Sequence, residues 1–323
     1  MRRAYRYGCA VLAMLAVVFA AVAAYPFLVG GTETIALDDA ARASLAGSRG
    51  LTFARLSDGY THFAWTGPED GAVVALVHGY TGPMTLWAGT ARALSAAGFR
   101  VLCYDLFGRG YSDRPEVRYT TDLFDRQLLE LLDAEGVAGP IDLVGQSMGG
   151  AIVVHFVDRH PERVRRFALM APAGFSLHEP IRYRMLHWPG VGEWSMGMFG
   201  DATLTRALDR MGVPEDAPYR RDYLEQMRYR GYKRALLSTL RHTPLLTLEP
   251  VYRRVGRLGK PSLLIWGTAD HVVPFAHQER VRAAIPNIEF HAIEGADHTA
   301  QQDNPEAVHA MLTAFFSRAD AAE

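Results

Sequence analysis

Short apolar runs alternate with longer amphipathic stretches along most of this chain, and that alternation limits the fold more than any other feature. Six runs have the length and residue types of buried strands: Ala72–Val77, Arg100–Tyr104, Ile141–Val144, Phe167–Met170, Ser262–Trp266 and Ile288–Ile293. Most are too apolar to leave one face in water, as in parallel strands that helices cover on both faces. Before them, residues 51–67 alternate around Asp58-Gly59, which predicts an opening hairpin. The pattern therefore predicts an α/β fold with a mostly parallel sheet and helices on both faces.

One long region has no strand-like run. From Ala173 to Pro250 the chain instead contains amphipathic stretches with helical periodicity, such as Arg220–His242. Because strand-like runs resume after this region, we interpret residues 173–250 as a helical cap inserted into a sheet domain. The two parts of that domain are predicted at 50–172 and 251–323.

The first 30 residues are predicted to lie outside the folded domain. Three arginines lie within the first six residues, no charge follows until Glu33, and Cys9–Ala24 is almost wholly apolar. Such a segment is typical of an export signal with small residues at its cleavage site, or of a membrane anchor of about 20 uncharged residues. We therefore expect 1–30 to be a signal peptide or anchor, 7–31 to allow membrane association, and 31–49 to be a linker. The protein is expected to be exported or membrane-anchored.

Composition excludes several classes of function. With 34 basic and 35 acidic residues and no long block of like charge, the chain shows no sign of binding nucleic acid. Of its two cysteines, Cys9 lies in the N-terminal segment and Cys103 in an apolar run, so neither an internal disulfide nor a cysteine metal site is expected. The glycines around residue 147 do not match a phosphate-binding loop, and we expect no metal, nucleotide or flavin cofactor.

The motif Gly145-Gln146-Ser147-Met148-Gly149 lies where a predicted strand gives way to a predicted helix. This context matters, because the five-residue pattern alone is weak and a serine at a tight turn can be purely structural. At a sharp strand-to-helix turn, bulky side chains two residues to either side would collide with neighbouring elements. The turn would aim the Ser147 hydroxyl at solvent, beside N–H groups of the helix N-terminus that stabilise an anion. We therefore predict that Ser147 is a nucleophile.

A serine nucleophile needs a base, and the base needs an acid to orient it. Asp270 follows the fifth strand-like run and His298 follows the sixth. Both are therefore predicted at the carboxyl edge of the sheet, where ligands bind in open α/β folds. The order Ser147, Asp270, His298 is the one that this arrangement requires. Asp297 and Asp303 remain the alternatives for the acid.

An oxyanion hole is predicted from two backbone N–H groups. The run that ends at Val77 leads into His78-Gly79-Tyr80, and the N–H of Tyr80 could join the N–H of Met148 in binding a developing oxyanion. His78 is predicted to be a hydrogen-bonded structural histidine, because another histidine already fills the role of base.

These residues belong to five segments that resemble the α/β-hydrolase fold superfamily, and within it the group of esterases, lipases and carbon–carbon hydrolases. The segments are HGYTGP, YDLFGRGYSDRP, GQSMGG, WGTADHVVP and GADHTAQQDNPEAV. The resemblance spans Ala72 to Ala319, with a gap over the insertion. It implies an α/β-hydrolase fold with residues 173–250 as a lid over the site. It implies these roles: Ser147 nucleophile, Asp270 acid, His298 base, and Tyr80 and Met148 oxyanion donors.

The resemblance also separates structure from chemistry in two places. Asp105, Arg109 and Ser112 lie in the loop DLFGRGYSDRP, which looks like a structural loop of the family. Gln146 stands where many relatives have histidine, and Asp297 replaces the glycine that usually precedes the base. The additional carboxylate leaves the pH optimum open.

The type of nucleophile narrows the reaction. Haloalkane dehalogenases and epoxide hydrolases of this fold use aspartate at the elbow, whereas serine favours acyl transfer to water. We expect a carboxylesterase or lipase that acts on small apolar esters, with short to medium acyl chains or monoacylglycerols. The segment Met185–Gly200, together with Met84 and Trp87, is expected either to line an apolar acyl pocket or to form ordinary core of the lid, since amphipathic cap helices must bury apolar residues. The alternatives are a carbon–carbon hydrolase of aromatic ring-cleavage products and a non-catalytic binding protein on the same fold.

Overall fold

The computed structural model describes residues 31–175 and 181–319, together with a few single positions between 14 and 24. The segment 1–30, predicted to be a signal peptide or membrane anchor, therefore lies almost wholly outside the described residues. Within the part of the chain that is described, no helix is both long and apolar enough to cross a bilayer.

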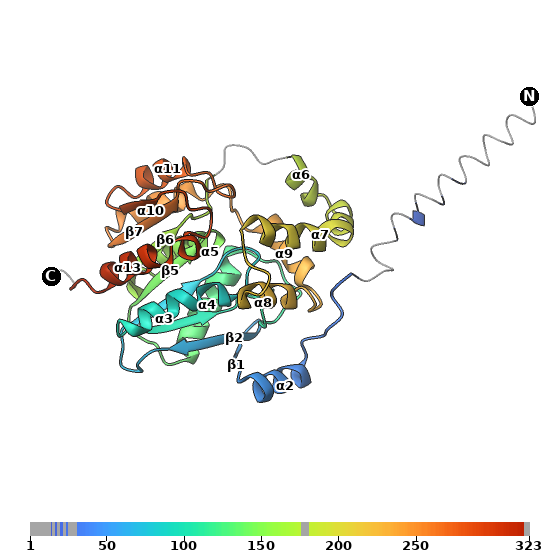
Figure 1. Ribbon diagram of the computed structural model, residues 1–323, viewed down its shortest axis with the longest axis horizontal. Helices are drawn as coiled ribbons and strands as arrows, with labels where there is room; N and C mark the ends of the chain where they lie inside the picture. Colours follow the sequence, from blue (N-terminus) through green and yellow to red (C-terminus); the bar gives the residue numbers. More distant parts are fainter. Residues whose placement is uncertain are drawn as a thin grey trace, which may run out of the picture.

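A mostly parallel sheet forms the centre of the molecule (Figure 1). Its strands are β1 (Thr52–Leu56), β2 (Gly59–Thr66), β3 (Val73–Val77), β4 (Arg100–Tyr104), β5 (Ile141–Gln146), β6 (Val164–Met170), β7 (Ser262–Gly267) and β8 (Glu289–Ile293). They lie in the order β1-β2-β4-β3-β5-β6-β7-β8. The β1–β2 hairpin and the β2–β4 pair are antiparallel, and the other pairs are parallel. The predicted α/β fold and its opening hairpin are confirmed.

Helices cover both faces of the sheet because its central strands are apolar on both sides. In β4, Leu102 and Tyr104 pack into one core cluster, and Val101 and Cys103 pack into the other. The first face is covered by α4 (Thr121–Ala134), α5 (Met148–Arg159), α10 (Glu249–Arg257) and α11 (His277–Ala284). The second face is covered by α3 (Ala88–Ala96) and α13 (Pro305–Phe316). Full burial of each such side chain contributes about 1.5–3 kcal/mol to folding.

Several short helices lie in the connections. They are the 3-10 helices η1 (Met84–Trp87) and η2 (Pro161–Arg163) and the single-turn helix α12 (Ala300–Asp303). The segment 31–49, expected to be a linker, contains the helix α2 (Asp39–Arg49). The Asp38 side chain caps it by accepting a hydrogen bond of 2.9 Å from Ala41 N. No residue of α2 is buried, so packing into the core does not account for this helix.

The elements described between β6 and β7 are helical. Those that precede α10 are α6 (Ile181–Arg184), η3 (Met185–His187), α7 (Val191–Arg210), α8 (Pro218–Gln226) and α9 (Tyr232–His242), and we call them the cap helices. They have an apolar cluster of their own, in which Leu208, Tyr223 and Leu236 meet Leu86 of η1. In Figure 1, α6 and α7 lie on the opposite side of the molecule from α13.

Candidate active site

Ser147 lies between the end of β5 and the start of α5, in a backbone conformation that L-residues rarely adopt. Its φ is 57° and its ψ is −122°. The chain is held in this turn on both sides: Ser147 N donates to Met170 O of β6 at 2.9 Å, and Ser147 O accepts from Ala173 N at 2.9 Å. A non-glycine residue in such a conformation costs about 1–3 kcal/mol, so the surrounding structure must enforce it. Stored strain of this kind is typical of functional sites.

The glycines of the motif are required by close packing of backbone. A Cβ at Gly149 would lie 2.1 Å from Val77 O, and a Cβ at Gly145 would lie 2.4 Å from Gly149 O. Neither contact is possible for a real side chain, and the neighbouring atoms are backbone that cannot move aside. The predicted steric role of these glycines is therefore confirmed: they let β3, β5 and α5 meet at the turn that carries Ser147.

His298 and Asp270 come together at the carboxyl edge of the sheet. Asp270 follows β7, His298 follows β8, and both are buried. His298 Nδ1 donates to Asp270 Oδ2 at 2.9 Å. Because a carboxylate can only accept, the proton lies on Nδ1 and leaves Nε2 able to take a proton from another group. This is the tautomer that a general base needs.

The Asp270 carboxylate is itself fixed by three further donors. Oδ1 accepts from the N–H groups of Val272 and Val273, each at 2.8 Å, and Oδ2 also accepts from Trp266 Nε1 at 3.2 Å. Trp266 is fully buried in the sheet. The loop and the sheet therefore determine where the carboxylate points, and through it the orientation of the His298 ring.

The other two acids proposed for this role point elsewhere. Asp297 Oδ1 accepts from the backbone N–H groups of His271 and His298, at 2.9 and 2.8 Å, and Asp303 Oδ2 accepts from Asp297 N at 2.8 Å. Asp297 thus ties together the loops that follow β7 and β8. Of these three carboxylates, Asp270 is the one that contacts the His298 ring.

The loop after β3 passes directly beside Ser147. A Cβ at Gly79 would lie 3.3 Å from Ser147 Cβ, so Gly79 lies immediately beside the proposed nucleophile. His78 is fully buried, with Nδ1 donating to Gly79 O at 2.9 Å and Nε2 accepting from Leu106 N at 2.9 Å. The ring therefore fastens the loop to the chain that follows β4, the hydrogen-bonded structural position that was predicted for it. As the first residue of α5, Met148 has an N–H without an intrahelical acceptor.

The cap helices form hydrogen bonds with the same loop after β3. The Tyr80 hydroxyl donates to Leu236 O of α9 at 2.8 Å, and Tyr80 O accepts from Arg109 Nε at 2.9 Å. Thr81 O accepts two hydrogen bonds of 2.8 Å, from Gln226 Nε2 and from the Tyr232 hydroxyl. Sequence reasoning assigned Arg109 to architecture and did not single out Gln226 or Tyr232. A buried polar residue on an otherwise apolar helix face would have been the signal, but burial is visible only in the fold.

Asp105, a buried acid after β4, holds the chain segments around it together through hydrogen bonds. Asp105 accepts from His62 Nδ1 at 2.6 Å, from Met84 N at 2.7 Å and from Tyr111 N at 2.9 Å. Burial alone would raise the pKa of Asp105, but the hydrogen bond and the charge of His62 outweigh it and lower the pKa to about 2. Burial lowers the pKa of His78 to about 4. Asp105 is therefore a structural anion, as its loop suggested.

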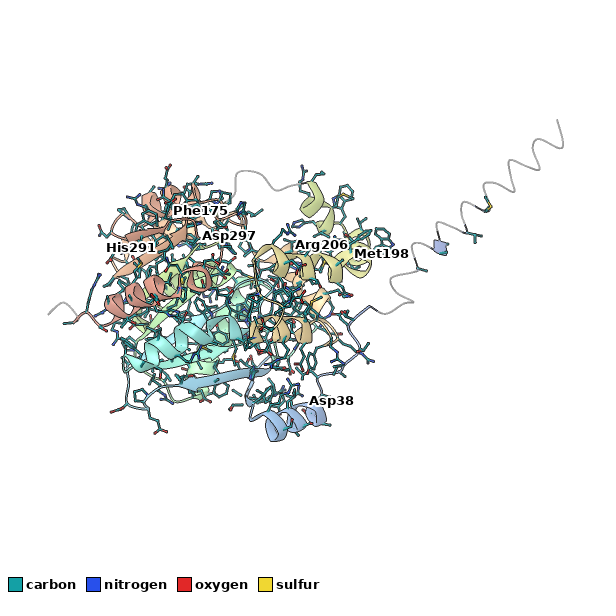
Figure 2. The ribbon with its side chains drawn as sticks, viewed as in Figure 1. Asp38, Phe175, Met198, Arg206, His291 and Asp297 are labelled. Carbon is teal, nitrogen blue, oxygen red and sulfur yellow. The ribbon has the colours of Figure 1, made fainter. Side chains whose placement is uncertain are left out.

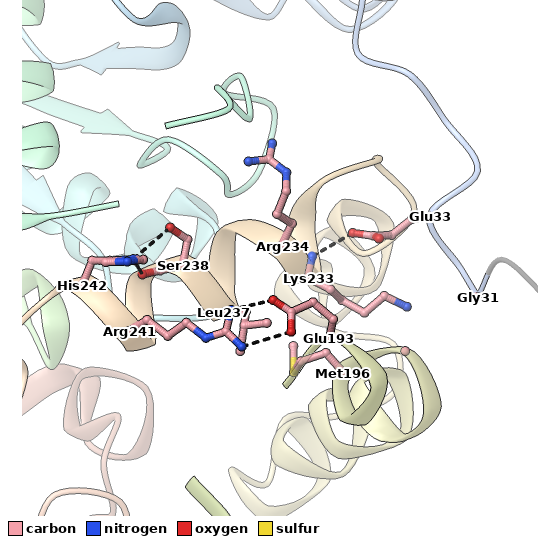
Figure 3. A pocket seen from close by; sticks show the side chains of 11 residues that line it. Gly31, Glu33, Glu193, Met196, Lys233, Arg234, Leu237, Ser238, Arg241 and His242 are labelled. Atoms are coloured by element: carbon pink, nitrogen blue, oxygen red, sulfur yellow. Dashed lines mark hydrogen bonds and ion pairs between the residues drawn. The ribbon is translucent and has the colours of Figure 1, made fainter. Parts of the chain in front are cut away.

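The predicted acyl pocket is not formed as expected. Met84 and Trp87 are buried in the core beneath α3, and Trp188 and Phe199 are 59% and 52% exposed to solvent. A cavity of about 350 Å³ lies instead between α7, α9 and residues 31–33 (Figure 3). Its lining includes Glu193, Met196 and Arg241 but none of the three residues proposed for catalysis. Composition could not distinguish a pocket wall from core or from surface, because all three can be rich in methionine and aromatic residues.

Comparison with known proteins agrees with this fold. The family model described as alpha/beta hydrolase fold matches residues 72–305. A 2-hydroxy-6-oxononadienedioate/2-hydroxy-6-oxononatrienedioate hydrolase of Cupriavidus pinatubonensis is 30% identical, over 81% of this chain and 94% of its own. The solved enol-lactonase of Burkholderia xenovorans LB400 matches 83% of this chain and 100% of its own, with a TM-score of 0.68 and 23% identity. A solved membrane phospholipase A matches 97% of this chain and 98% of its own, with a TM-score of 0.68 and 22% identity. The chain belongs to the alpha/beta hydrolase family.

Proposed function

We propose that this protein is a serine hydrolase that cleaves a bond next to a substrate carbonyl. The observation that carries the proposal is the pairing of a strained serine turn with a histidine whose Nδ1 is held 2.9 Å from a buried carboxylate. Ser147 attacks the carbonyl carbon while His298 Nε2 takes the hydroxyl proton. Asp270 stabilises the imidazolium that forms, and the N–H groups of Tyr80 and Met148 stabilise the oxyanion.

The intermediate then collapses to an acyl-enzyme. The bond to the leaving group breaks, and His298 returns its proton to the leaving atom. Water, deprotonated by the same histidine, attacks the acyl group and releases a carboxylic acid and free Ser147. No step of this cycle needs an oxidant, a reductant or a second substrate besides water.

For the bond that is cleaved, the relatives favour a carbon–carbon bond over the ester expected from the sequence. The C. pinatubonensis relative is a hydrolase of 2-hydroxy-6-oxononadienedioate, whose chemical name includes a ketone and two carboxylates but no ester. Hydrolysis of such a compound must break a carbon–carbon bond beside the ketone. The 2-hydroxy diene must first shift to its 2-oxo tautomer, in which the hydroxyl proton has moved to the carbon beside the ketone. The electron pair of the broken bond is then delocalised into a dienolate of the leaving group, which takes the proton from His298. We therefore propose 6-oxo-dienoic acids as the first substrate class.

Ester hydrolysis is the second candidate. It uses the same residues, with an alcohol as leaving group, and the apolar segment before Glu33 favours it because substrates at a membrane are rich in carboxylic esters. The solved enol-lactonase and membrane phospholipase A share the fold, and their names add lactones and phospholipids to the compounds to test.

The experiment compares both classes on the purified full-length chain. We expect kcat/KM for a 2-hydroxy-6-oxo-dienoate, followed by loss of its absorbance, to exceed kcat/KM for nitrophenyl esters from acetate to palmitate. Ser147→Ala should abolish both activities and labelling by a fluorophosphonate. Activity confined to esters would select the second candidate, and full activity in folded Ser147→Ala would reject the serine mechanism for both.

A further inference from the structure

Large apolar side chains are exposed together on the first part of the cap. Ile181, Met185, Trp188 and Phe199 are 68%, 43%, 59% and 52% exposed, and we call these four residues the apolar cap face. They lie within nineteen residues of sequence, on α6, η3, the turn after it and α7. Exposed apolar residues scattered singly need no explanation, but four large ones so close in sequence, a tryptophan and a phenylalanine among them, favour an interaction surface.

The apolar cap face is held in place by partly buried and exposed polar contacts. Arg241 of α9 donates to Leu186 O at 2.9 Å and to Trp188 O at 3.1 Å, and it pairs with Glu193 of α7 at 2.5 Å (Figure 3). The hydrogen bond from Arg241 lowers the pKa of Glu193 to about 2, so the pair stays charged near neutral pH. The backbone around Trp188 is therefore fixed while its side chain points to solvent.

The uncharged N-terminal segment joins the folded body at α7, on the side of that helix where Asp201 meets Lys233 of α9. A Cβ at Gly31 would lie 2.7 Å from Lys233 Nζ and 3.3 Å from Asp201 Oδ2, and the Thr32 hydroxyl donates to Asp201 Oδ1 at 3.0 Å. Asp201 lies on α7, two residues after Phe199. Tyr7 to Thr32 carry no charge, so the chain that leads into Gly31 is apolar up to the point where it meets α7.

The acidic side chains of α7 are paired, whereas two of its arginines are exposed. Each acidic side chain of α7 is paired with a cation of α8 or α9: Asp209 with Arg220 at 2.6 Å, Asp201 with Lys233 at 3.0 Å and Glu193 with Arg241 at 2.5 Å. Arg206 and Arg210 follow Phe199 on α7 and are exposed. Figure 2 shows Met198 and Arg206 on this outer helix of the cap. The surface therefore has apolar side chains next to exposed positive charge, and its acids are neutralised.

We propose that the apolar cap face rests on an anionic lipid bilayer, next to the membrane-associated N-terminal segment. The inference rests on the expectation that residues 7–31 enter a membrane, and it is independent of which bond the enzyme cleaves. Trp188 and Phe199 lie at the level of the lipid headgroups, where aromatic side chains are favoured. Arg206 and Arg210 extend their aliphatic stems along the apolar boundary and place the guanidinium groups among lipid phosphates.

The test measures lipid contact at single positions of the full-length chain in vesicles. In a Cys9→Ser background the remaining Cys103 is buried and does not label, so Met185→Cys or Phe199→Cys carries an environment-sensitive fluorophore. Leu258→Cys is the matched control, because Leu258 and Met185 are both 43% exposed and Leu258 lies beyond α10 on the core. We expect a blue shift of emission and quenching by spin-labelled lipid at 185 and 199, and neither at 258.

Lipid charge provides the second measurement. In vesicles of phosphatidylcholine with phosphatidylglycerol, quenching at 199 should be stronger than in phosphatidylcholine alone, and Arg206→Gln with Arg210→Gln should remove the difference. Three results would overturn the proposal: failure of the chain to float with vesicles, equal quenching at 199 and 258, or a blue shift at 199 that grows with protein concentration in detergent. The last of these would identify a second protein copy as the partner.

Discussion

The hydroxyl of Tyr232 donates a hydrogen bond of 2.8 Å to Thr81 O, so a cap helix holds the loop that supplies a proposed oxyanion donor. Gln226 Nε2 donates to the same carbonyl at 2.8 Å, and both residues are buried. Because Gly79 of this loop lies beside Ser147, a small shift of Thr81 moves the N–H of Tyr80 relative to the substrate oxygen. The cap is thereby coupled to the geometry of the site.

Removing one of these hydrogen bonds should slow the reaction without weakening substrate binding. We expect Tyr232→Phe to lower kcat about 2- to 10-fold, the equivalent of about 0.5–1.5 kcal/mol for one hydrogen bond, with little change in KM. Gln226→Ala together with Tyr232→Phe should lower kcat further than either change alone. Steady-state kinetics with either substrate class measures this. A rise in KM at constant kcat would instead indicate that these residues bind substrate.

The N-terminal linker forms hydrogen bonds with Met227, Arg228 and Lys233 of the cap, which lie close in sequence to Gln226 and Tyr232. The Thr32 hydroxyl, which has one proton to share between Asp201 Oδ1 and Met227 O, lies 3.0 Å from each, Ile35 N donates to Arg228 O at 2.9 Å and Lys233 N donates to Glu33 Oε1 at 2.7 Å. A chain that begins at Thr32 should therefore remain soluble and active, whereas one that begins at Ala36 should lose these contacts. We expect the shorter chain to melt about 2–6 °C lower and to have a reduced kcat. Equal melting temperatures and rates for the two chains would show that the linker contributes nothing.

The strain at Ser147 predicts that two inactive variants differ in stability. Ser147→Ala and Ser147→Gly both remove the nucleophile, and each should lose turnover on the order of 10⁶-fold. Only glycine adopts a φ of 57° with a ψ of −122° without steric cost, so Ser147→Gly should be more stable than Ser147→Ala by about 1 kcal/mol. Chemical denaturation of the two proteins measures the difference. Equal stability would mean that the turn is not strained in solution.

The sequence predicted most of the sheet because its central strands are mostly apolar and buried, as in Val73–Val77 and Ser262–Gly267. Predicted and observed strands agree closely, as at 262–266 and Ser262–Gly267. The steric role of the glycines at 145 and 149 could also be predicted from the sequence. Where two backbone segments approach this closely, there is no room for a Cβ atom. These features depend on local sequence or on sterics that are common to the fold.

Features that depend on long-range placement could not be predicted. The helix α2 has no buried face, and the contacts of Gln226 and Tyr232 with Thr81 join residues about 150 positions apart. A pocket wall and a membrane-facing surface are rich in the same apolar residue types, so the composition of Met185–Gly200 does not distinguish them. Only the fold shows that Trp188 and Phe199 are exposed.

Stability should fall as the pH is lowered, in two steps set by buried groups. Burial lowers the folded-state pKa of His78 to about 4 from an ordinary value of 6.5, and the nearby Asp105 and Arg109 act on it with opposite signs. The stabilisation is therefore complete above pH 6.5 and is lost as the pH falls toward 4, by about 3 kcal/mol. Asp105, with its pKa near 2, contributes above its ordinary value of 3.8 and loses its contribution below it. His78→Gln, whose side chain cannot titrate, should lack the first step and keep the second in denaturation curves measured from pH 7 to pH 2.

The roles of two carboxylates only 27 positions apart can be separated by matched substitutions. Asp270→Asn leaves the shape of the site intact but replaces an acceptor beside His298 Nδ1 with an amide that can donate, which disfavours the Nδ1–H tautomer. We expect kcat to fall about 10⁴-fold, with KM nearly unchanged. Asp297→Asn retains an oxygen that can accept from the N–H groups of His271 and His298, so its kcat should change less than about 10-fold. Steady-state rates across pH 5 to 9, with circular dichroism to verify folding, measure both. If Asp297→Asn were the more damaging change, the acid of the site would have to be reassigned to Asp297, and the 2.9 Å contact between His298 and Asp270 would be structural.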